Sequence, residues 1–205
     1  MTKERQLRKQ EEIRNEILTA ARNIISTEGV QGLSIRKLTK AIDYSPAIIY
    51  HYFKDKNEIV ETLVGEGYQR ILAAVKSVEK NEEEPEKEIR EAFNKYIRAA
   101  LEFPEEYKAF MLNESPEVLN RTRILEKGIA EKSPTMRFLY EAIQRGIDKG
   151  RFSPQDPELT AQVLWLASFG VIMRLIVEKD IGQDQIDRLI ERYFDLVFKG
   201  IMLRG

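Results

Sequence analysis

Cysteine is absent from the 205 residues, and histidine occurs once, at His51. Without cysteine the chain forms no disulfide and has no thiolate nucleophile, as is usual for a protein of a reducing cytoplasm. One histidine without cysteine cannot build a zinc site of the usual nitrogen and sulfur ligands. No nucleophile motif surrounds any serine, and no glycine-rich phosphate-binding loop is present. We therefore expect no metal, no cofactor and no enzymatic activity.

Long apolar runs are equally scarce. The longest, residues 163–177, is shorter than a usual membrane span and contains Arg174. The first residues, MTKERQLRKQEEIRNE, carry too many charges for a signal peptide. We expect a cytoplasmic protein that does not enter a membrane.

Charged residues are frequent but unevenly placed. Residues 1–60 hold 11 Lys and Arg against 8 Asp and Glu, whereas residues 61–205 hold 22 against 26. A mildly basic amino-terminal part on an acidic remainder favours orientation of that part toward a polyanion. Hydrophobic residues make up 42% of the chain, which is enough for a sizeable core in one or two compact domains.

Apolar residues recur at steps of three and four along most of the chain, and no segment alternates as a strand would. This pattern predicts an all-α fold of about nine helices. A further segment, residues 116–132, is polar and only moderately helical. The predicted helices cover residues 13–29, 35–42, 46–52, 57–80, 85–101, 104–112, 134–150, 157–179 and 186–201.

The stretch SIRKLTKAIDYSPAIIYHYFKDK, which begins at Ser34, predicts two short helices joined by a tight turn. Ser34 is placed to cap the first helix, and Ser45 and Pro46 are placed to begin the second. Ile49 and Phe53 share one face of that second helix. Two helices of this length and spacing form a helix-turn-helix. Because such short helices are marginal alone, packing against their neighbours must hold them.

The outward positions of this unit carry groups suited to DNA. Small and polar side chains on the second helix can enter a groove, where an alanine contacts a thymine methyl group. The flanking cations can neutralise phosphates and fix the register. His51 has two interpretations of equal weight, a contact to DNA or a half-buried packing residue. The predicted DNA-binding residues are Ser34, Arg36, Lys37, Ser45, Pro46, Ala47, Tyr50, His51, Tyr52, Lys54 and Lys56.

The segment GLSIRKLTKAIDYSPAIIYHYFKDKNEIV resembles the DNA-binding domain of the TetR family of bacterial transcriptional regulators. The resemblance covers residues 13–63. In this family the turn usually holds a glycine and then a valine, where the present chain has Asp43 and Tyr44. The shared features are Gly32-Leu33, a helix that ends at Ile42, Tyr50 followed by His-Tyr-Phe, and Lys54-x-Lys56 before an acidic and apolar helix start.

The resemblance implies two domains. Residues 1–56 would form a helix-turn-helix DNA-binding domain, and residues 57–205 a helical domain for effector binding and dimerisation. It also implies a homodimer joined through the last two helices, which binds a palindromic operator in double-stranded DNA. Most members of the family are repressors. A small-molecule effector in the second domain would act through the helix at residues 57–80 and release the operator.

Aromatic residues are frequent in the second half of the chain. Each is individually more typical of a core, but together they allow a largely apolar pocket between helices, and so we expect a hydrophobic effector. The run WLASFG resembles a Trp-x-x-x-His-Gly signature of one TetR branch, with Phe169 in place of the histidine. The residues expected to line the pocket are Phe93, Tyr96, Phe110, Met111, Phe138, Trp165, Phe169 and Met173.

Two alternatives remain open at this stage. The first is a helical ligand-binding or scaffold protein that has lost DNA binding, and Asp43 in the turn is the one feature that favours it. The second is an enzyme built on an all-α scaffold, which the missing catalytic constellation opposes.

Overall fold

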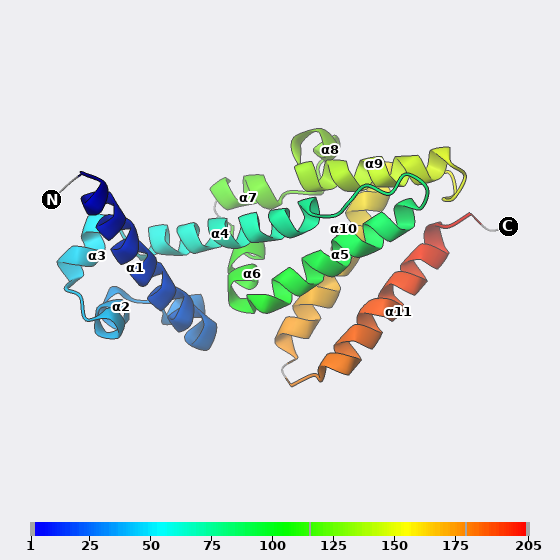
Figure 1. Cartoon of the computed structure of the whole chain (residues 1–205). Helices are drawn as coiled ribbons and strands as arrows, with labels where there is room; N and C mark the ends of the chain where they lie inside the picture. The colour runs from blue at the N-terminus through cyan, green and yellow to red at the C-terminus, as the bar shows by residue number, and fades with distance from the viewer. Residues whose placement is uncertain (1–2, 115, 179, 204–205) are drawn as a thin grey trace. The chain divides into compact units, whose positions relative to one another are not determined.

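The computed structural model describes residues 3–114, 116–178 and 180–203, without the side chains at positions 117 and 121. Within these ranges the chain forms eleven α-helices and no strand, apart from an isolated antiparallel bridge between Phe152 and Met202 (Figure 1). The prediction of an all-α fold is therefore confirmed. The helices are α1 (Lys3–Gly32), α2 (Ile35–Ile42), α3 (Pro46–Tyr52), α4 (Lys56–Lys76), α5 (Pro85–Glu102), α6 (Pro104–Met111), α7 (Pro116–Thr122), α8 (Ile129–Lys132), α9 (Pro134–Asp148), α10 (Pro157–Val177) and α11 (Gln183–Ile201).

Some helix boundaries differ from those that the periodicity predicts. The polar segment 116–132 contains two short helices, α7 and α8, which raises the number above nine. Helix α1 begins at Lys3, well before the predicted start at Ile13, and α4 ends at Lys76. Gly29 interrupts α1 with φ 71° and ψ 174°. This is a conformation that glycine adopts without the steric cost of a Cβ, so the predicted helix end at Gly29 appears as a kink.

Proline determines where many helices begin. Six of the seven prolines are the first residue of a helix, in α3, α5, α6, α7, α9 and α10. At that position the missing N–H costs no hydrogen bond, and the fixed φ suits the first turn. Side chains complete two of these starts. The Asp156 carboxylate accepts hydrogen bonds from the backbone N–H groups of Glu158 (2.9 Å) and Leu159 (3.1 Å), and Ser133 caps α9.

The chain divides into two compact units. The first contains the residues up to Gln69 together with Phe103–Leu112, and the second contains Arg70–Glu102 and the residues from Asn113 onward. Helix α6 therefore belongs to the first unit, where it packs on α1. The predicted domain boundary after residue 56 divides the chain by function, whereas these two units are defined by contacts between residues. The predicted boundary therefore remains a prediction.

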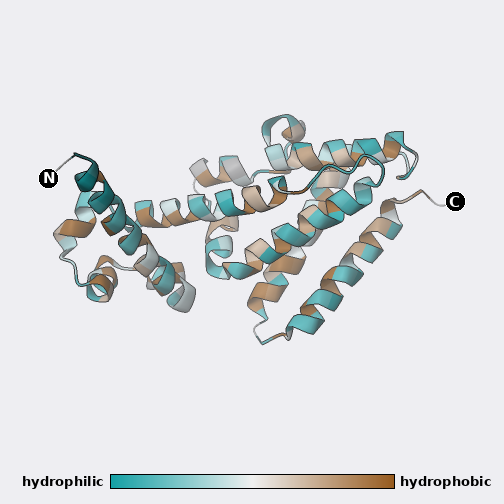
Figure 2. Cartoon of the chain, in the orientation of Figure 1, coloured by the Kyte–Doolittle hydropathy of each residue, from teal (hydrophilic) through white to brown (hydrophobic). Residues whose placement is uncertain are grey.

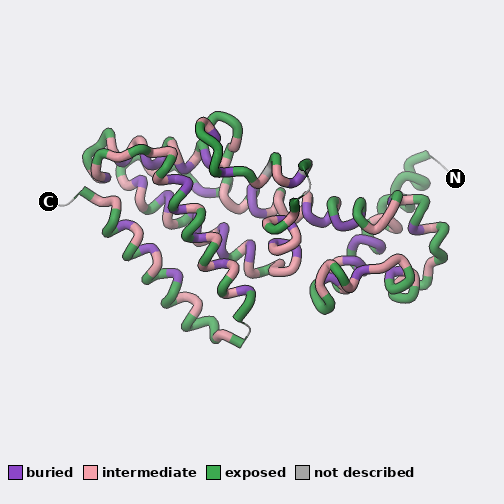
Figure 3. Tube along the Cα trace, turned by 180° about the vertical axis from the view of Figure 1, so that it is seen from behind, coloured by how far each residue is buried: buried purple, intermediate pink, exposed green. Residues whose placement is uncertain are grey.

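Each unit has its own hydrophobic core. In the second unit α9 packs against α5, α8 and α10, and α11 attaches to α5. Figure 3 shows buried residues recurring along one side of α11, namely Ile190, Phe194 and Phe198. The residues of the first core include Ile17, Ile25, Leu38, Ile49, Phe53, Ile59 and Leu63, and those of the second include Ile89, Ile97, Met136, Ile143 and Ile172.

Helix α10 is the most apolar helix of the chain, as Figure 2 indicates by colour. Its 21 residues are long and apolar enough to cross a membrane by length and composition. The apolar run 163–177 alone is shorter than a usual span, and the preceding residues 157–162 bring the helix to this length. In the fold, α10 packs on α5 and α9. A core helix of a soluble protein passes the same test of length and hydropathy.

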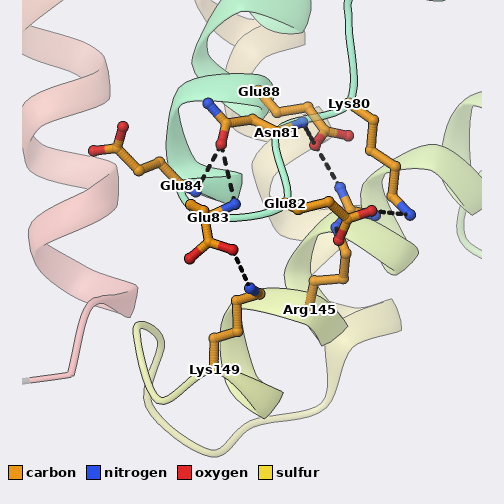
Figure 4. A network of polar contacts seen from close by, with 8 residues as sticks. All are labelled: Lys80, Asn81, Glu82, Glu83, Glu84, Glu88, Arg145 and Lys149. Carbon is orange, nitrogen blue, oxygen red and sulfur yellow. Dashed lines mark hydrogen bonds and ion pairs between the residues drawn. The ribbon is translucent and has the colours of Figure 1, made fainter.

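The loop between α4 and α5 is held to α9 by a polar network (Figure 4). The buried Glu88 carboxylate accepts a hydrogen bond from the backbone N–H of Asn81 (2.8 Å) and forms an ion pair with Arg145. On the loop surface, the Lys149 ammonium lies 2.9 Å from a carboxylate oxygen of Glu83. The acidic run Glu82-Glu83-Glu84 of this loop is thus fixed on the carboxyl-terminal end of α9.

Glu88 should contribute most of the stability of this network. Replacement of Glu88 by Ala leaves the Arg145 guanidinium, whose side chain is 15% exposed, without its buried partner. Loss of one member of a buried pair costs about 3 kcal/mol, so we expect the urea midpoint of unfolding to fall clearly. Glu83→Ala is the matched control, because the Glu83 side chain is 84% exposed and a surface pair contributes less than about 1 kcal/mol. Equal losses for the two variants would contradict this account.

Candidate nucleic-acid interface

Helices α2 and α3 form the predicted helix-turn-helix. The backbone of Ser34 is extended, and its hydroxyl accepts a hydrogen bond from the N–H of Lys37 (3.3 Å), which confirms the predicted cap of α2. Asp43 ends α2 in the left-handed region, with φ 53° and ψ 36°. Pro46 begins α3 as predicted. Ser45 occupies the N-cap position with extended angles, as predicted, although its hydroxyl makes no capping hydrogen bond.

One face of α3 is buried and the other is free. Ile49 is fully buried and Phe53, at the end of the helix, is 2% exposed. The Arg14 guanidinium of α1 lies 5.1 Å from the centre of the Phe53 ring, a favourable cation–π distance. On the opposite face Tyr50 is 55% exposed, and Pro46, Ala47 and His51 are exposed as well. The side chains predicted to enter a groove are therefore accessible.

His51 and Tyr52 stand at the end of α3. Their rings meet edge to face, with centroids 5.1 Å apart. His51 is exposed and Tyr52 half-buried. Of the two interpretations of His51, half-buried packing is therefore excluded by its exposure, and contact with DNA remains.

The cations predicted to bind phosphates differ in whether another group of the chain already pairs with them. Arg36 and Lys54 are exposed, and within the described part of the chain their side chains form no ion pair. Lys37 forms an exposed ion pair with Glu28, and the Lys56 ammonium lies 3.5 Å from the carbonyl oxygen of Leu33. An exposed ion pair is worth at most about 1 kcal/mol, so Lys37 can exchange its partner for a phosphate.

Tyr44 ties the turn to α1, a contact that the sequence did not indicate. Its hydroxyl donates a hydrogen bond to the Glu16 carboxylate (2.7 Å). This hydrogen bond stabilises the protonated hydroxyl and raises the pKa of Tyr44 above its ordinary value. A smaller residue at this position has no hydroxyl to reach α1, so Tyr44 adds a polar brace to the turn.

Arg22 joins three helices of the first unit. Its Nε donates to the Glu106 carboxylate of α6 (2.7 Å), and its Nη2 donates to the Glu66 carboxylate of α4 (2.8 Å). Glu106 is only 5% exposed, so Arg22 supplies a cation to a buried carboxylate. The three residues are far apart in sequence and belong to different amphipathic patterns, which is why sequence analysis missed them.

The residues predicted to line an effector pocket are brought together only in part. Four of them form a chain of rings in the second unit, with centroid distances of 6.4 Å for Phe93–Tyr96, 6.4 Å for Tyr96–Trp165 and 5.6 Å for Trp165–Phe169. Phe138 and Met173 are half-buried residues of the same unit. The remaining two, Phe110 and Met111, belong to the first unit, where the ring of Phe110 meets that of Tyr68.

The described ranges contain no group of three or more His, Cys, Asp or Glu side chains that could hold a metal ion.

A helix-turn-helix with a free second helix, followed by a larger helical unit, defines a DNA-binding regulator of the bacterial type. Residues 17–63 match the family model of bacterial regulatory proteins of the tetR family, and residues 87–200 match that of the tetracyclin repressor-like C-terminal domain. The chain belongs to the TetR family of transcriptional regulators.

Known relatives agree with this assignment. The chain is 28% identical over 167 residues to the transcriptional repressor AcnR of Corynebacterium efficiens. This match covers 79% of the present chain and 81% of the relative. It is 26% identical over 152 residues to the regulator YhgD of Bacillus subtilis, with coverage of 72% and 76%. A TetR-family regulatory protein from Rhodococcus RHA1 has the same fold, with a TM-score of 0.72, 18% identity and coverage of 94% and 98%.

The left-handed turn residue makes a specific prediction. A β-branched residue in this conformation is strained by roughly 1–2 kcal/mol, so Asp43→Val should lower the free energy of unfolding of the chain by that amount. Asp43→Gly and Asp43→Asn should leave it nearly unchanged, because both tolerate a positive φ. Urea unfolding followed by circular dichroism measures the difference. If Asp43→Val were as stable as Asp43→Gly, the turn could not require the left-handed conformation.

Proposed function

We propose that this TetR-type regulator is a homodimeric repressor that binds a near-palindromic operator and is released by a small hydrophobic effector. It acts in the cytoplasm, where bacterial DNA lies. The observation that carries the proposal is the free face of α3, beside Arg36 and Lys54, whose side chains have no competing ion-pair partner in the described chain. The scaffold alternative depended on Asp43, and Asp43 adopts the conformation that the turn needs.

Each subunit places α3 in a major groove of the duplex. Ala47 is small enough to approach a thymine methyl group, and the hydroxyl of Tyr50 reaches a phosphate. Arg36, Lys54 and Lys56 neutralise phosphates on either side and fix the register of the helix. The hydroxyls of Ser34 and Ser45 and the rings of His51 and Tyr52 complete the proposed surface, with Lys37 after it leaves Glu28.

The last two helices supply the dimer contact. They expose large apolar side chains that their own subunit does not cover. On α10 these are Leu159 (59% exposed), Val163 (62%), Leu166 (43%) and Val177 (58%), and on α11 they are Leu189 (42%) and Leu196 (56%). Apolar side chains gathered on two neighbouring helices are typical of an interface. A two-fold dimer then requires operator half-sites about one helical turn, roughly 34–36 Å, apart.

Effector release requires a ligand that prefers the conformation with lower DNA affinity. The chain of rings from Phe93 to Phe169 offers the apolar and aromatic surface for such a ligand. Helix α4 begins at Lys56, close behind α3, and ends in the second unit, so it is the element through which a change would reach α3.

Selection of bound duplexes from random DNA tests the proposal. We expect enrichment of a near-palindromic sequence whose half-sites are about one helical turn apart, because two copies of α3 related by a two-fold axis read the same bases. Recovery of unrelated sequences, or of a single unrepeated half-site, would contradict the dimeric operator. Purified protein and sequencing of the retained DNA are sufficient.

The two lysines after α3 should contribute sequence-independent affinity. The double variant Lys54→Ala and Lys56→Ala is expected to bind both the selected and random duplexes more weakly. The slope of log affinity against log salt should become shallower by roughly 0.9 for each phosphate that the variant no longer neutralises. Fluorescence anisotropy at several salt concentrations measures both effects.

Lys127→Ala is the matched control for this experiment, because Lys127 is an exposed lysine of the second unit. It should leave affinity and salt slope unchanged. If the double variant bound only the selected sequence more weakly, Lys54 and Lys56 would be reading bases rather than holding phosphates.

A further inference from the structure

Gly170 has no evident role within its own chain. It lies in the middle of α10 and is exposed, where glycine costs about 1 kcal/mol relative to alanine. A Cβ added there would meet no atom within 4 Å. Gly146 of α9 is different, because an added Cβ would overlap the ring of Phe152. The absence of a side chain at Gly170 therefore relieves no crowding inside the subunit, and it leaves this stretch of the helix surface open to close approach from outside.

The exposed residues around Gly170 are arranged symmetrically. Val163 and Leu166 precede it by seven and four residues, and Arg174 and Val177 follow it by four and seven. All four are exposed, with the Arg174 side chain at 72%. The spacings lie on one helical face. A two-fold axis through Gly170 would place Val163 opposite Val177. It would place Leu166 opposite the aliphatic stem of Arg174.

We propose that Gly170 lies on the two-fold axis of the homodimer, where α10 of one subunit crosses α10 of the other at their closest approach. The inference rests on the dimer of the proposed function and specifies its geometry. In a two-fold interface each residue before the axis meets one after it, so Val163 contacts Val177 of the second copy. Leu166 packs on the stem of Arg174, whose guanidinium keeps its exposed pair with Glu178. The missing side chain lets the two helix backbones come together.

Single-cysteine variants test the position of the axis without background, because the chain contains no cysteine. A disulfide needs Cα atoms about 4.4–6.8 Å apart, a distance that a residue has to its own copy only near the axis. Oxidation of Gly170→Cys with copper phenanthroline should give a covalent dimer that a reductant reverses. Val163→Cys is the matched control, since two copies at seven residues from the axis of antiparallel helices are roughly 20 Å apart. It should stay uncrosslinked.

Sedimentation of the wild-type protein distinguishes failure of the proposed axis position from failure of the proposed dimer. A dimer in which Val163→Cys crosslinks and Gly170→Cys does not would overturn the axis at Gly170 and leave the dimer intact. A monomer at micromolar concentration would overturn the dimer itself and this inference with it.

Gly170→Leu provides a second measurement. Inside the subunit the new side chain meets open space, so the helical circular dichroism of the protein should be retained. At the crossing it forces the helices apart, and overpacking of 1–3 kcal/mol corresponds to a dimer dissociation constant raised roughly 10- to 100-fold. An unchanged dissociation constant would show that no helix approaches Gly170.

Discussion

The burial of Ile49 and Phe53 is the interaction on which the helix-turn-helix head, formed by α1, α2 and α3, depends. Helix α3 has seven residues, too few to persist in water by themselves. Full burial of two large apolar side chains stabilises its position by roughly 1.5–3 kcal/mol each, and Arg14 covers the Phe53 ring. Because this anchoring uses one face of the helix, Ala47 and Tyr50 are left on the other. The same packing that makes α3 a helix thus determines which of its side chains are exposed.

The first unit also includes a segment from much later in the chain. Helix α6 packs on α1 there, and Arg22 links the buried Glu106 of α6 to Glu66 of α4. Separation of α6 from α1 would break the ion pair between Arg22 and Glu106. The orientation of α1, which in turn supports α2 and α3 of the head, is therefore coupled to α6 by a charge pair. A regulator that responds to a ligand needs such a connection between its later residues and its DNA-binding head.

Local chemistry made much of the fold predictable. Prolines and capping residues mark helix starts at Ser34, Pro46 and Asp156, and Asp43 tolerates the left-handed turn. Periodicity failed where a segment was short or polar, as in α7 and α8. It could not reveal pairings between distant segments, such as Arg22 with Glu106, since each residue has an ordinary place in its own helix. For the same reason, counting aromatic residues grouped Phe110 with Phe93, although the two belong to different units.

The charges of the head constrain how it can bind. The net charge of the first 60 residues, which include the head, is small, since they hold 11 cationic against 8 anionic side chains, and Lys37 is engaged by Glu28 in the free protein. Long-range attraction to DNA is therefore modest, and the cations of the head act through local phosphate contacts. In the proposed dimer, the close fit of α3 and the simultaneous binding of two heads would add to these contacts, because the second binding event becomes an intramolecular one. Such a dimer would be controlled through the spacing of its heads, because a changed spacing would prevent the second head from binding while the surface of each head is unaltered.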